Sequence, residues 1–370
     1  MITNVVVAAA LAVAPAVPSW EIVPLPPDPG NLVATTALSA NDIWTAGFTL
    51  SQRIVDGRPV VTFQPQVRHW NGRTWSPVPT PPLPDGRTGR LNAIAASARD
   101  QVWAVGDSWG TDGTRSLIER WDGTAWTHVP ADDLPGVNQN LYGVAAISPA
   151  DAWAVGSTAD VEHTGPMAQH WDGVRWTRVP LPADLGDAGL SAVAAGGPSD
   201  VWAAGYSMAG ELVEPLVLRW DGVAWHRVAL PSTTELGLAR LTAITVSHGQ
   251  VWAGGESTVG GAFNRKPLAV HVTARGAAIE RTPDERGQLN AVTTVGRDVW
   301  AVGYRYDEEG EPHAYALRRA PGGQWSRAAA PEAPGATLSS ITAVPNTRTL
   351  WTTGAMDGPD GPTPLIARFP

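Results

Sequence analysis

The stretch Gln101-Val-Trp-Ala-Val-Gly106 is one copy of a pattern that recurs along this 370-residue chain. Six copies of Val-Trp-Ala-x-Gly occur with small variations, and a seventh lies near the end. Successive tryptophans of the pattern are separated by 59, 50, 49, 50, 48 and 51 residues. They are Trp44, Trp103, Trp153, Trp202, Trp252, Trp300 and Trp351. The chain therefore consists of seven units of similar length.

The second unit shows what each unit contains. Its apolar runs at 91–96, 101–106, 117–121 and 126–130 have the length of short strands. Asp122-Gly123 separates the last two runs, and both residues tolerate the positive φ of a tight hairpin. Four strands in a period near 50 predict an all-β, seven-bladed β-propeller with four antiparallel strands per blade. Radial repetition lets such a chain grow as one domain without one central core.

The hairpin between the third and fourth strands recurs with little change. It is Trp70–Trp75, Trp121–Trp126, Trp171–Trp176 and Trp220–Trp225 in four units. The fifth unit lacks both of its tryptophans, and the sixth keeps only Trp325. These two units keep the register of the repeat although they have lost tryptophans. We therefore expect the hairpin tryptophans to pack the blades rather than to bind a ligand.

The two ends of the chain complete each other. The seventh unit ends after its third apolar run, at 365–369, and has no fourth strand. Trp20-Glu-Ile-Val-Pro24 matches the fourth-strand pattern of Trp126-Thr-His-Val-Pro130. We therefore expect the N-terminal strand to close the last blade, which hides two sheet edges.

Composition excludes several classes of function. The net charge is −9, and the 26 basic residues form no run, so nucleic acid and anionic membranes are poor partners. The chain has no cysteine, which excludes disulfides, thiolate catalysis and cysteine-based metal sites. No apolar run is long enough to predict a membrane span.

Residues 1–16 differ from the rest. An apolar run from Asn4 to Ala14 precedes Ala14-Pro15-Ala16, which has the form of a signal-peptide cleavage site, although no basic residue precedes the run. We expect a signal peptide and a secreted or extracytoplasmic protein. The alternative is a loose N-terminal arm on a cytoplasmic protein. In both cases 17–370 form the single propeller domain.

The repeats resemble those of bacterial propeller proteins of the kelch and Asp-box type over about residues 19 to 370. The Asp122-Gly123-x-x-Trp126 hairpin is similar to an Asp-box, which in that family lies between the third and fourth strands. It departs from the pattern because Asp and Gly are adjacent and the preceding Ser or Thr is missing. The arginine triad and tyrosine nucleophile of the sialidases that carry such boxes have no counterpart that we can place. The resemblance therefore implies a fold and no activity.

A ligand site is expected on the face that carries the long second-to-third and fourth-to-first connections. The longest connection contains Ile54–Thr62, a predicted hairpin that would arch over the site. Side chains that follow the first-strand Leu or the second-strand Gly should point to this face. The predicted ligand-binding residues are Phe48, Asn92, Asp107, Trp109, Tyr142, Tyr206, Glu256, Asn290 and Tyr304. Aromatic and carboxylate groups together suit a sugar or an organic cation.

The histidines do not predict a metal site. His69, His170 and His271 share a third-strand position at which we place Arg120, Arg219, Arg319 and Arg368 in the other units. Side chains in separate outer strands cannot converge on one ion. We expect this basic residue to pair with a carboxylate or carbonyl at the rim, and we expect no metal and no cofactor.

Three functions stay open at this point. The first is an extracytoplasmic, monomeric propeller that binds a small molecule, a glycan or a protein on the loop face. The second is an enzyme, such as a glycosidase, a lyase or a cyclisation catalyst, that uses Asp107 and Glu256 at the channel mouth. The third is a purely structural module.

Overall fold

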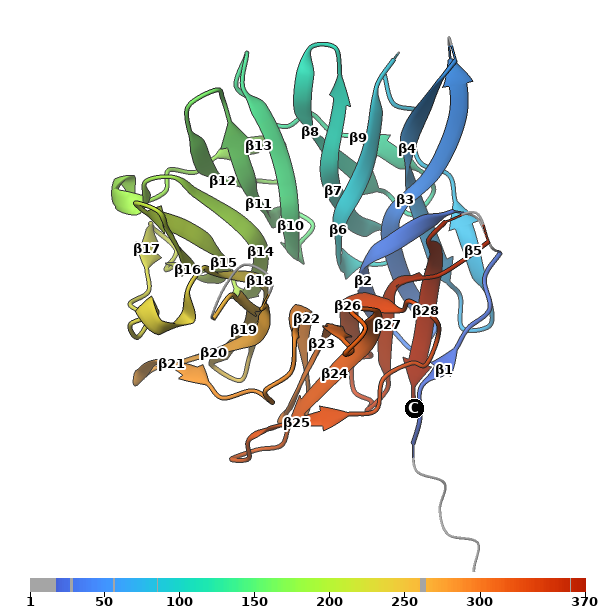
Figure 1. Cartoon of the computed structure of the whole chain (residues 1–370). Coiled ribbons are helices and arrows are strands. Elements are labelled where there is room, and N and C mark those ends of the chain that lie inside the picture. Colours follow the sequence, from blue (N-terminus) through green and yellow to red (C-terminus); the bar gives the residue numbers. More distant parts are fainter. Residues whose placement is uncertain (1–17, 27–28, 56, 85, 260–263, 360) are drawn as a thin grey trace, which may run out of the picture.

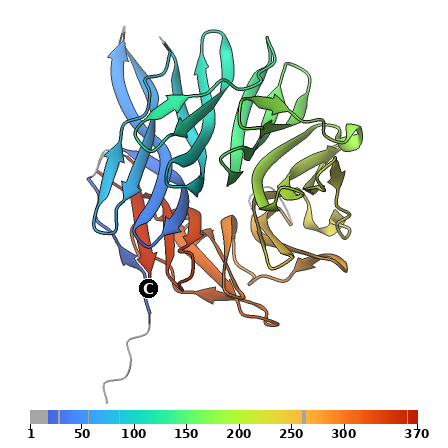
Figure 2. The same ribbon diagram turned by 180° about the vertical axis from the view of Figure 1, so that it is seen from behind.

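Seven antiparallel sheets of four strands each surround a central axis, as the repeat period predicts (Figure 1). The computed structural model describes residues 18–26, 29–55, 57–84, 86–259, 264–359 and 361–370. The first strand of each blade lies nearest the axis and the fourth lies at the periphery, and the view from behind shows the same ring (Figure 2). Helix in these residues is limited to two short 3₁₀ turns, Ala183–Leu185 and Thr234–Leu236. The chain is an all-β, seven-bladed β-propeller.

The strand bounds follow the repeat. Blades one and two comprise β2 (Gly30–Ser39), β3 (Asp42–Val55), β4 (Arg58–Trp70), β5 (Trp75–Val78), β6 (Thr88–Ala98), β7 (Gln101–Gly110), β8 (Gly113–Trp121) and β9 (Trp126–His128). Blades three and four comprise β10 (Asn138–Ser148), β11 (Asp151–Ala159), β12 (Thr164–Trp171), β13 (Trp176–Arg178), β14 (Ala188–Gly197), β15 (Asp200–Ala209), β16 (Leu212–Trp220) and β17 (Trp225–Arg227). Blades five and six comprise β18 (Ala239–Ser247), β19 (Gln250–Ser257), β20 (Lys266–Thr273), β21 (Gly276–Glu280), β22 (Gly287–Val295), β23 (Asp298–Tyr306), β24 (Pro312–Arg319) and β25 (Trp325–Ala328).

Blade seven is completed by the N-terminal strand, as predicted. Its strands are β26 (Thr337–Ala343), β27 (Leu350–Met356), β28 (Thr363–Phe369) and β1 (Glu21–Ile22). Glu21 pairs with Arg368 and Ile22 with Ala367, so β1 covers the outer edge of β28. The predicted signal peptide or arm, 1–16, lies outside the described residues. No helix among the residues that the structure describes is long and apolar enough to cross a membrane.

The glycine of the repeated pattern is required by a close backbone approach. In every blade a β-bulge follows the first-strand Leu, for example between Leu91 and Ala93. The Gly that ends the pattern pairs with this Leu, and a Cβ added at Gly106 would overlap the carbonyl oxygen of Arg90. The bulged residue is left unpaired and free to turn towards the next blade.

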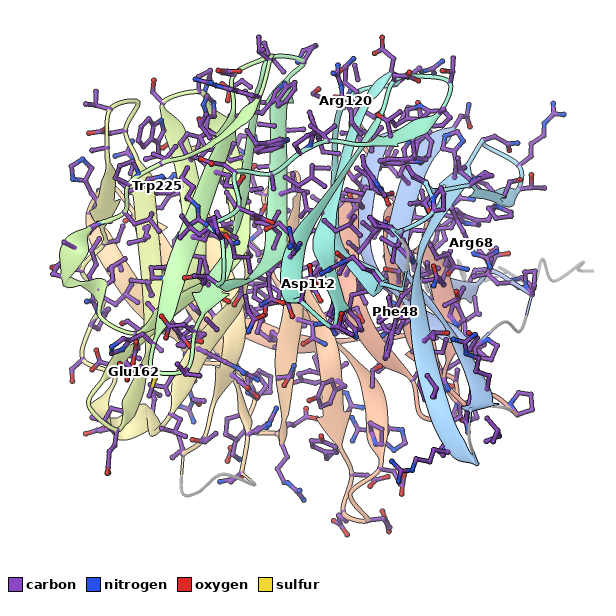
Figure 3. All side chains as sticks on the ribbon, turned by 90° about the horizontal axis from the view of Figure 1, so that it is seen from above. Phe48, Arg68, Asp112, Arg120, Glu162 and Trp225 are labelled. Carbon is purple, nitrogen blue, oxygen red and sulfur yellow. The ribbon has the colours of Figure 1, made fainter. Side chains whose placement is uncertain are left out.

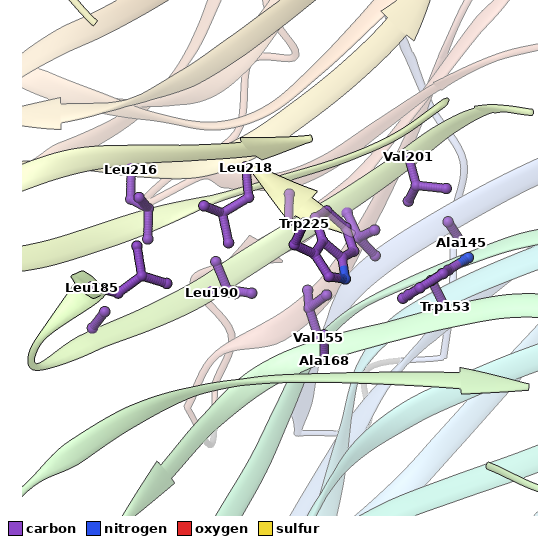
Figure 4. Packing of buried hydrophobic residues seen from close by; sticks show 13 residues of the cluster. Ala145, Trp153, Val155, Ala168, Leu185, Leu190, Val201, Leu216, Leu218 and Trp225 are labelled. Carbon is purple, nitrogen blue, oxygen red and sulfur yellow. The ribbon is translucent and has the colours of Figure 1, made fainter. Parts of the chain in front are cut away.

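The tryptophan and alanine of the pattern point to opposite faces of their blade. Trp153 and Val155 pack against Leu218 and Trp225 of blade four (Figure 4). Ala152 and Ala154 face blade two instead, within the cluster of Trp103. The hydrophobic core is therefore a series of layers between neighbouring blades, because the side chains of a strand alternate between its two faces.

Most of these layers share one arrangement, which we call the aromatic triad. It joins the second-strand Trp of one blade to the aromatic residue that ends the third strand and the one that begins the fourth strand of the next. Trp44 lies 5.2 Å from Trp121 and 5.8 Å from Trp126 between ring centroids. Trp103, Trp153 and Trp351 form the same triad with Trp171 and Trp176, with Trp220 and Trp225, and with Trp70 and Trp75. The closing strand supplies the fifth triad, in which Trp300 and Trp20 both pack on Phe369.

The basic third-strand residue supports the scaffold, as predicted. His69 stacks on Trp44 and His170 packs on Trp153 in a tilted geometry, and each places Nε2 2.9 Å from the aspartate that begins the second strand of its blade. One assignment from the sequence is wrong: in blade six the residue paired with Trp300 is Arg318, and it bonds Asp298. Arg319 lies one position further, where most blades have the second triad ring. The sequence misleads because two arginines stand side by side there.

A buried carboxyl group lies in blade two. Glu119 is fully buried, and its nearest basic partner, His128 Nε2, is 3.5 Å from Oε1. Burial raises the pKa of Glu119, and the interaction with His128 only partly opposes this. Blade three has Gln169 in the same register, opposite an alanine of the second strand. The position therefore accepts a neutral amide.

We expect Glu119→Gln to raise the melting temperature at neutral pH. A carboxyl whose pKa is raised in the fold stabilises the fold while it is protonated, and this contribution is lost as the pH rises through the folded pKa. The gain from the substitution should therefore shrink as the pH falls from about 7 towards about 4, the ordinary range of a glutamic acid. Thermal melts at both pH values check this, with exposed Glu162→Gln as the matched control. An equal gain at both pH values would contradict it.

Candidate functional site

The two faces of the ring differ in their connections. The turn between strands three and four lies against the turn between strands one and two, since a Cβ at Gly123 would lie 3.1 Å from the Cβ of Asp100. We call this the short-turn face and the other the loop face. In the side view Arg120 and Trp225 lie towards the upper side, while Phe48 and Glu162 lie towards the lower, loop side (Figure 3).

A cavity of about 490 Å³ opens at the axis on the loop face. Five consecutive blades contribute to its wall, which includes Val33, Arg90, Tyr142, Ser191, Tyr206 and Arg240. A second cavity of about 260 Å³ adjoins it between blades four and five. Tyr206 and Arg240 line both cavities, and Val213, Leu238, Glu256 and Arg265 line the second. The two hollows form one candidate site, which we call the axial site.

The carboxylates predicted at this site lie beneath arginines. The side chain of Asp107 is 3% exposed; it accepts hydrogen bonds from Asn92 Nδ2 at 2.6 Å and Arg90 Nε at 3.3 Å. Glu256 is 6% exposed and is held by Arg240 at 2.6 Å and Arg265 at 3.0 Å. Asp107 therefore lies beside the first cavity without lining it, Glu256 lies in the wall of the second, and both carboxylates are covered by guanidinium groups.

The surface that meets solvent is cationic. The side chains of Arg90, Arg240 and Arg265 are 38%, 46% and 39% exposed. The three guanidinium groups lie over two buried carboxylates, so this group of side chains has a net formal charge of +1. The whole chain, in contrast, has a net charge of −9. Guanidinium groups bind carboxylates and phosphates through paired N–H donors, so the axial site suits an anionic group.

Tyr142 and Tyr206 complete the wall, and Tyr304 lies outside both cavities. The ring of Tyr206 lies over Gly189, where a Cβ would come within 2.9 Å of its Cε1. Burial raises the pKa of Tyr142. Burial also raises the pKa of Tyr304 to about 12, and its hydroxyl lies 2.9 Å from Gln288 Oε1. The phenols of Tyr142 and Tyr304 are therefore neutral hydrogen-bonding groups at ordinary pH.

Two predicted site residues also join neighbouring blades. Asn92 donates from Nδ2 to the carbonyl oxygen of Leu141 at 2.9 Å, and Asn290 donates to that of Leu338 at 2.8 Å. Thr242 makes the same bond to Leu289. All three are bulged residues, so the bulge aims a polar side chain at the next blade. Asn290 and Tyr304 line neither cavity but connect to Arg265 through Gln288.

The remaining predicted residues lie beside the axial site. Phe48 packs on Phe63, and Phe63 packs on Trp109, at 5.3 Å in each case. The long β3–β4 hairpin is anchored here, because Phe63 also bonds Thr88 of blade two through its backbone. Arg90 lies over the ring of Trp109 at 5.9 Å, which connects this aromatic group to the axial arginines. The described contacts place the hairpin base against blade two and do not place it over the axial cavity.

Sequence reasoning missed Arg90, Arg240, Arg265 and Gln288. The first-strand Leu pairs with the second-strand Gly, so the residue before the Leu faces the residue after the Gly. This pairing joins Arg90 to Asp107, Arg240 to Glu256 and Gln288 to Tyr304. In an antiparallel pair of strands these two residues lie opposite each other. Aligning the residue before each Leu with the residue after each Gly would therefore have shown the pairs.

Comparisons with known proteins identify the fold class. No family model and no curated protein matches the sequence. YCF48 bound to D1 peptide superposes with a TM-score of 0.58 at 13% identity, over 96% of this chain and 99% of that one. YCF48 from Cyanidioschyzon merolae gives 0.56 at 17% identity, over 94% and 98%. A protein of unknown function from Dyadobacter fermentans DSM 18053 gives 0.54 at 10% identity, over 76% and 94%. At these identities the likeness supports the seven-bladed propeller fold alone.

Proposed function

We propose that this protein binds a partner protein through an acidic peptide segment that enters the axial site on the loop face. The observation that supports this most strongly is the set of three half-exposed arginines over two buried carboxylates. A rigid ring with a hollow on its loop face is a common arrangement for binding. The structural neighbour YCF48 was solved with a D1 peptide, and a binding role is consistent with that.

The buried carboxylates prepare the arginines for such a partner. Glu256 holds Arg240 and Arg265 from below and fixes where their remaining N–H donors point. Positioned guanidinium groups bind a carboxylate with less loss of side-chain entropy than free ones. Val213, Leu238 and the ring of Tyr206 provide apolar surface beside them. A peptide with an acidic group next to an apolar side chain meets both requirements.

An enzymatic role is not favoured by this arrangement. Acid–base hydrolysis needs two carboxyl groups that reach the substrate. Asp107 lines neither cavity, and the buried carboxylate of Glu256 in the wall of the second cavity is paired with Arg240 and Arg265, so neither carboxylate is free to reach a substrate. The half-exposed guanidinium groups of the axial site are instead suited to binding an anion.

Arg240→Gln tests the proposal. Glu256 keeps Arg265 as a partner in this variant, so we expect the protein to fold normally. The probe is a fluorescein-labelled peptide selected on the full chain from a random phage-displayed library. We expect the selected peptides to be rich in Asp and Glu, and the variant to raise the dissociation constant of the probe roughly tenfold or more.

Arg219→Gln is the matched control. Arg219 is also half-exposed and paired with an aspartate, Asp200 at 3.1 Å, but it lies at the short-turn end of its blade. Binding of the probe should be unchanged in this variant and should weaken with salt in the wild type. Selected peptides without acidic residues, or equal affinity for wild type and Arg240→Gln, would contradict the proposal. The extracytoplasmic location stays a prediction from the sequence.

A further inference from the structure

Each blade has one residue on the outer edge of its third strand that the shorter fourth strand does not reach. In blade two it is Ser116, which pairs with Asp107, the residue after the second-strand Gly. Its backbone groups point away from the second strand, since its N–H donates to Asp133 Oδ2 at 3.2 Å. The N–H and C=O at this position therefore need partners from outside the sheet.

The other blades remove or satisfy these groups, except blade six. Five blades carry a proline here, which has no N–H; they are Pro65, Pro166, Pro215, Pro267 and Pro364. In blades one and five the carbonyl oxygen also accepts a hydrogen bond, from the hydroxyl groups of Thr80 and Thr282. Blade six has Ala314 at the edge and Ala330 in the place of the threonine. Within the part of the chain that the structure describes, Ala314 has no such partner for its outward N–H and C=O.

A cavity of about 580 Å³ lies beside this unpaired edge. It lies between β24 and the connection that leads from blade six to blade seven. Its apolar surface comes from small side chains, namely Ala314, Ala316, Ala328, Ala330 and Ala333. Its volume is within the range of pockets that hold small ligands.

Comparison with blade four shows why blade six has the larger hollow. The third and fifth residues after the fourth-strand Trp are Val228 and Leu230 in blade four, and they are Ala328 and Ala330 in blade six. The matching cavity of blade four, lined by Val228 and Leu230, has only about 250 Å³. Blade three also has Val and Leu at these two positions. Blade six therefore lacks the aliphatic side chains that fill this place elsewhere.

The polar lining of the cavity favours a carboxylate. Arg305 and Arg327 share the carboxylate of Glu285 at 3.7 and 3.9 Å, which is longer than a hydrogen bond. The guanidinium donors of both arginines are thus free for a second anion, and the side chain of Arg327 is 55% exposed. His313 is already paired with an aspartate at 2.7 Å, and Glu332 is exposed to solvent.

We propose that this cavity binds the carboxyl-terminal residue of a peptide, with an aliphatic side chain of the size of leucine. Its carboxylate accepts from Ala314 N–H and pairs with Arg305 or Arg327, and its amide N–H donates to Ala314 C=O. Its side chain fills the space beside Ala328 and Ala330. The peptide lies where a longer fourth strand would continue, so it adds to the free edge of β24. The cavity shares no lining residue with the axial site and is independent of the function proposed there.

The probes are the peptide Gly-Ser-Gly-Ser-Ala-Leu, N-acetyl-leucine and N-acetyl-leucinamide, observed by saturation-transfer NMR with the full chain. We expect the peptide to bind at least as tightly as N-acetyl-leucine. The amide should bind roughly tenfold more weakly than the acid, because it lacks the charge that pairs with the arginines. If N-acetyl-leucine binds more tightly than the peptide, the cavity holds a free acyl amino acid and the assignment to a peptide is overturned.

Two substitutions make blade six resemble the other blades. Ala330→Leu fills the hollow as Leu230 does in blade four, so it should abolish binding while the melting temperature is kept or raised. Ala229→Leu, at an exposed alanine of the matching connection in blade four, is the control and should leave binding intact. Ala314→Pro introduces the residue that five blades carry, so we expect it to fold. It should weaken binding of the peptide roughly tenfold, because one N–H donor is lost.

Arg327→Gln tests the charge of the site and leaves Glu285 with Arg305. It should weaken the peptide and N-acetyl-leucine severalfold and leave N-acetyl-leucinamide unchanged, whereas Arg240→Gln in the axial site should change none of the three. The proposal is overturned if the wild type does not bind the peptide, if the amide binds as tightly as the acid, or if Ala330→Leu binds the peptide as tightly as the wild type. Should Ala330→Leu not fold, equal affinity of wild type and Ala314→Pro for the peptide overturns it.

Discussion

Trp153→Ala should lower the free energy of unfolding by about 3–5 kcal/mol, the range for removal of a large buried aromatic side chain. Trp153 is 1% exposed and lies between blades three and four, where it packs on Trp220 and Trp225. Its Nε1 has no hydrogen-bond partner within the part of the chain that the structure describes, so the loss is one of packing. Urea denaturation followed by circular dichroism measures it as a lower midpoint.

Trp109→Ala is the matched control for this experiment. Trp109 is half-exposed and packs on one ring, Phe63, outside the aromatic triads. Its removal should shift the midpoint much less. The affinity of folded Trp153→Ala for an axial-site peptide should equal that of the wild type, because the triad lies between the blades. A stable Trp153→Ala protein that no longer binds the peptide would show that the triad belongs to the site.

The fold was predictable because its physical requirements recur seven times. The pattern's Gly must lack a side chain where the backbone of the first strand approaches, as at Gly106. Its Trp must fill the layer between two blades, as Trp153 does. A requirement that repeats with a fixed period is visible in one sequence, and it fixes the number of blades, the strand order and the closing strand at Trp20.

The site was predictable only in part because it does not repeat. Asp107 and Glu256 were found from their place after the Gly, but their arginines were not. Arg90 and Arg240 come before the Leu, and only the register of two strands shows that they cover the carboxylates. Arg265 comes from the loop before β20, where no repeat position identifies it. The sequence predicts an anionic site from Asp107 and Glu256. Because both carboxylates are buried beneath arginines, the surface of the site is cationic instead.

Deletion of residues 1–26 should destabilise the ring far more than deletion of residues 1–16. The longer deletion removes Trp20, which packs on Phe369 at 5.4 Å and donates from Nε1 to the carbonyl oxygen of Ala329 at 2.8 Å. It also removes Ile22 and Val23, the latter bonded through its N–H to Ile366 O at 2.9 Å. Blade seven is then left with three strands and an open edge on β28.

We expect the longer deletion to aggregate or to melt roughly 10 °C or more below the shorter one, because several buried contacts are lost together. Differential scanning calorimetry of both proteins at one concentration measures the difference, and light scattering detects association through the open edge. The point variant Trp20→Ala should melt between the two, since it keeps the backbone pairing of β1 and loses the ring. Hydrogen exchange should show the loss of protection first in β28, where β1 no longer covers the backbone N–H and C=O groups. If the two deletions melt together, the strand at Trp20 to Pro24 does not hold the ring closed, and the contacts of blade seven with blades one and six are sufficient by themselves.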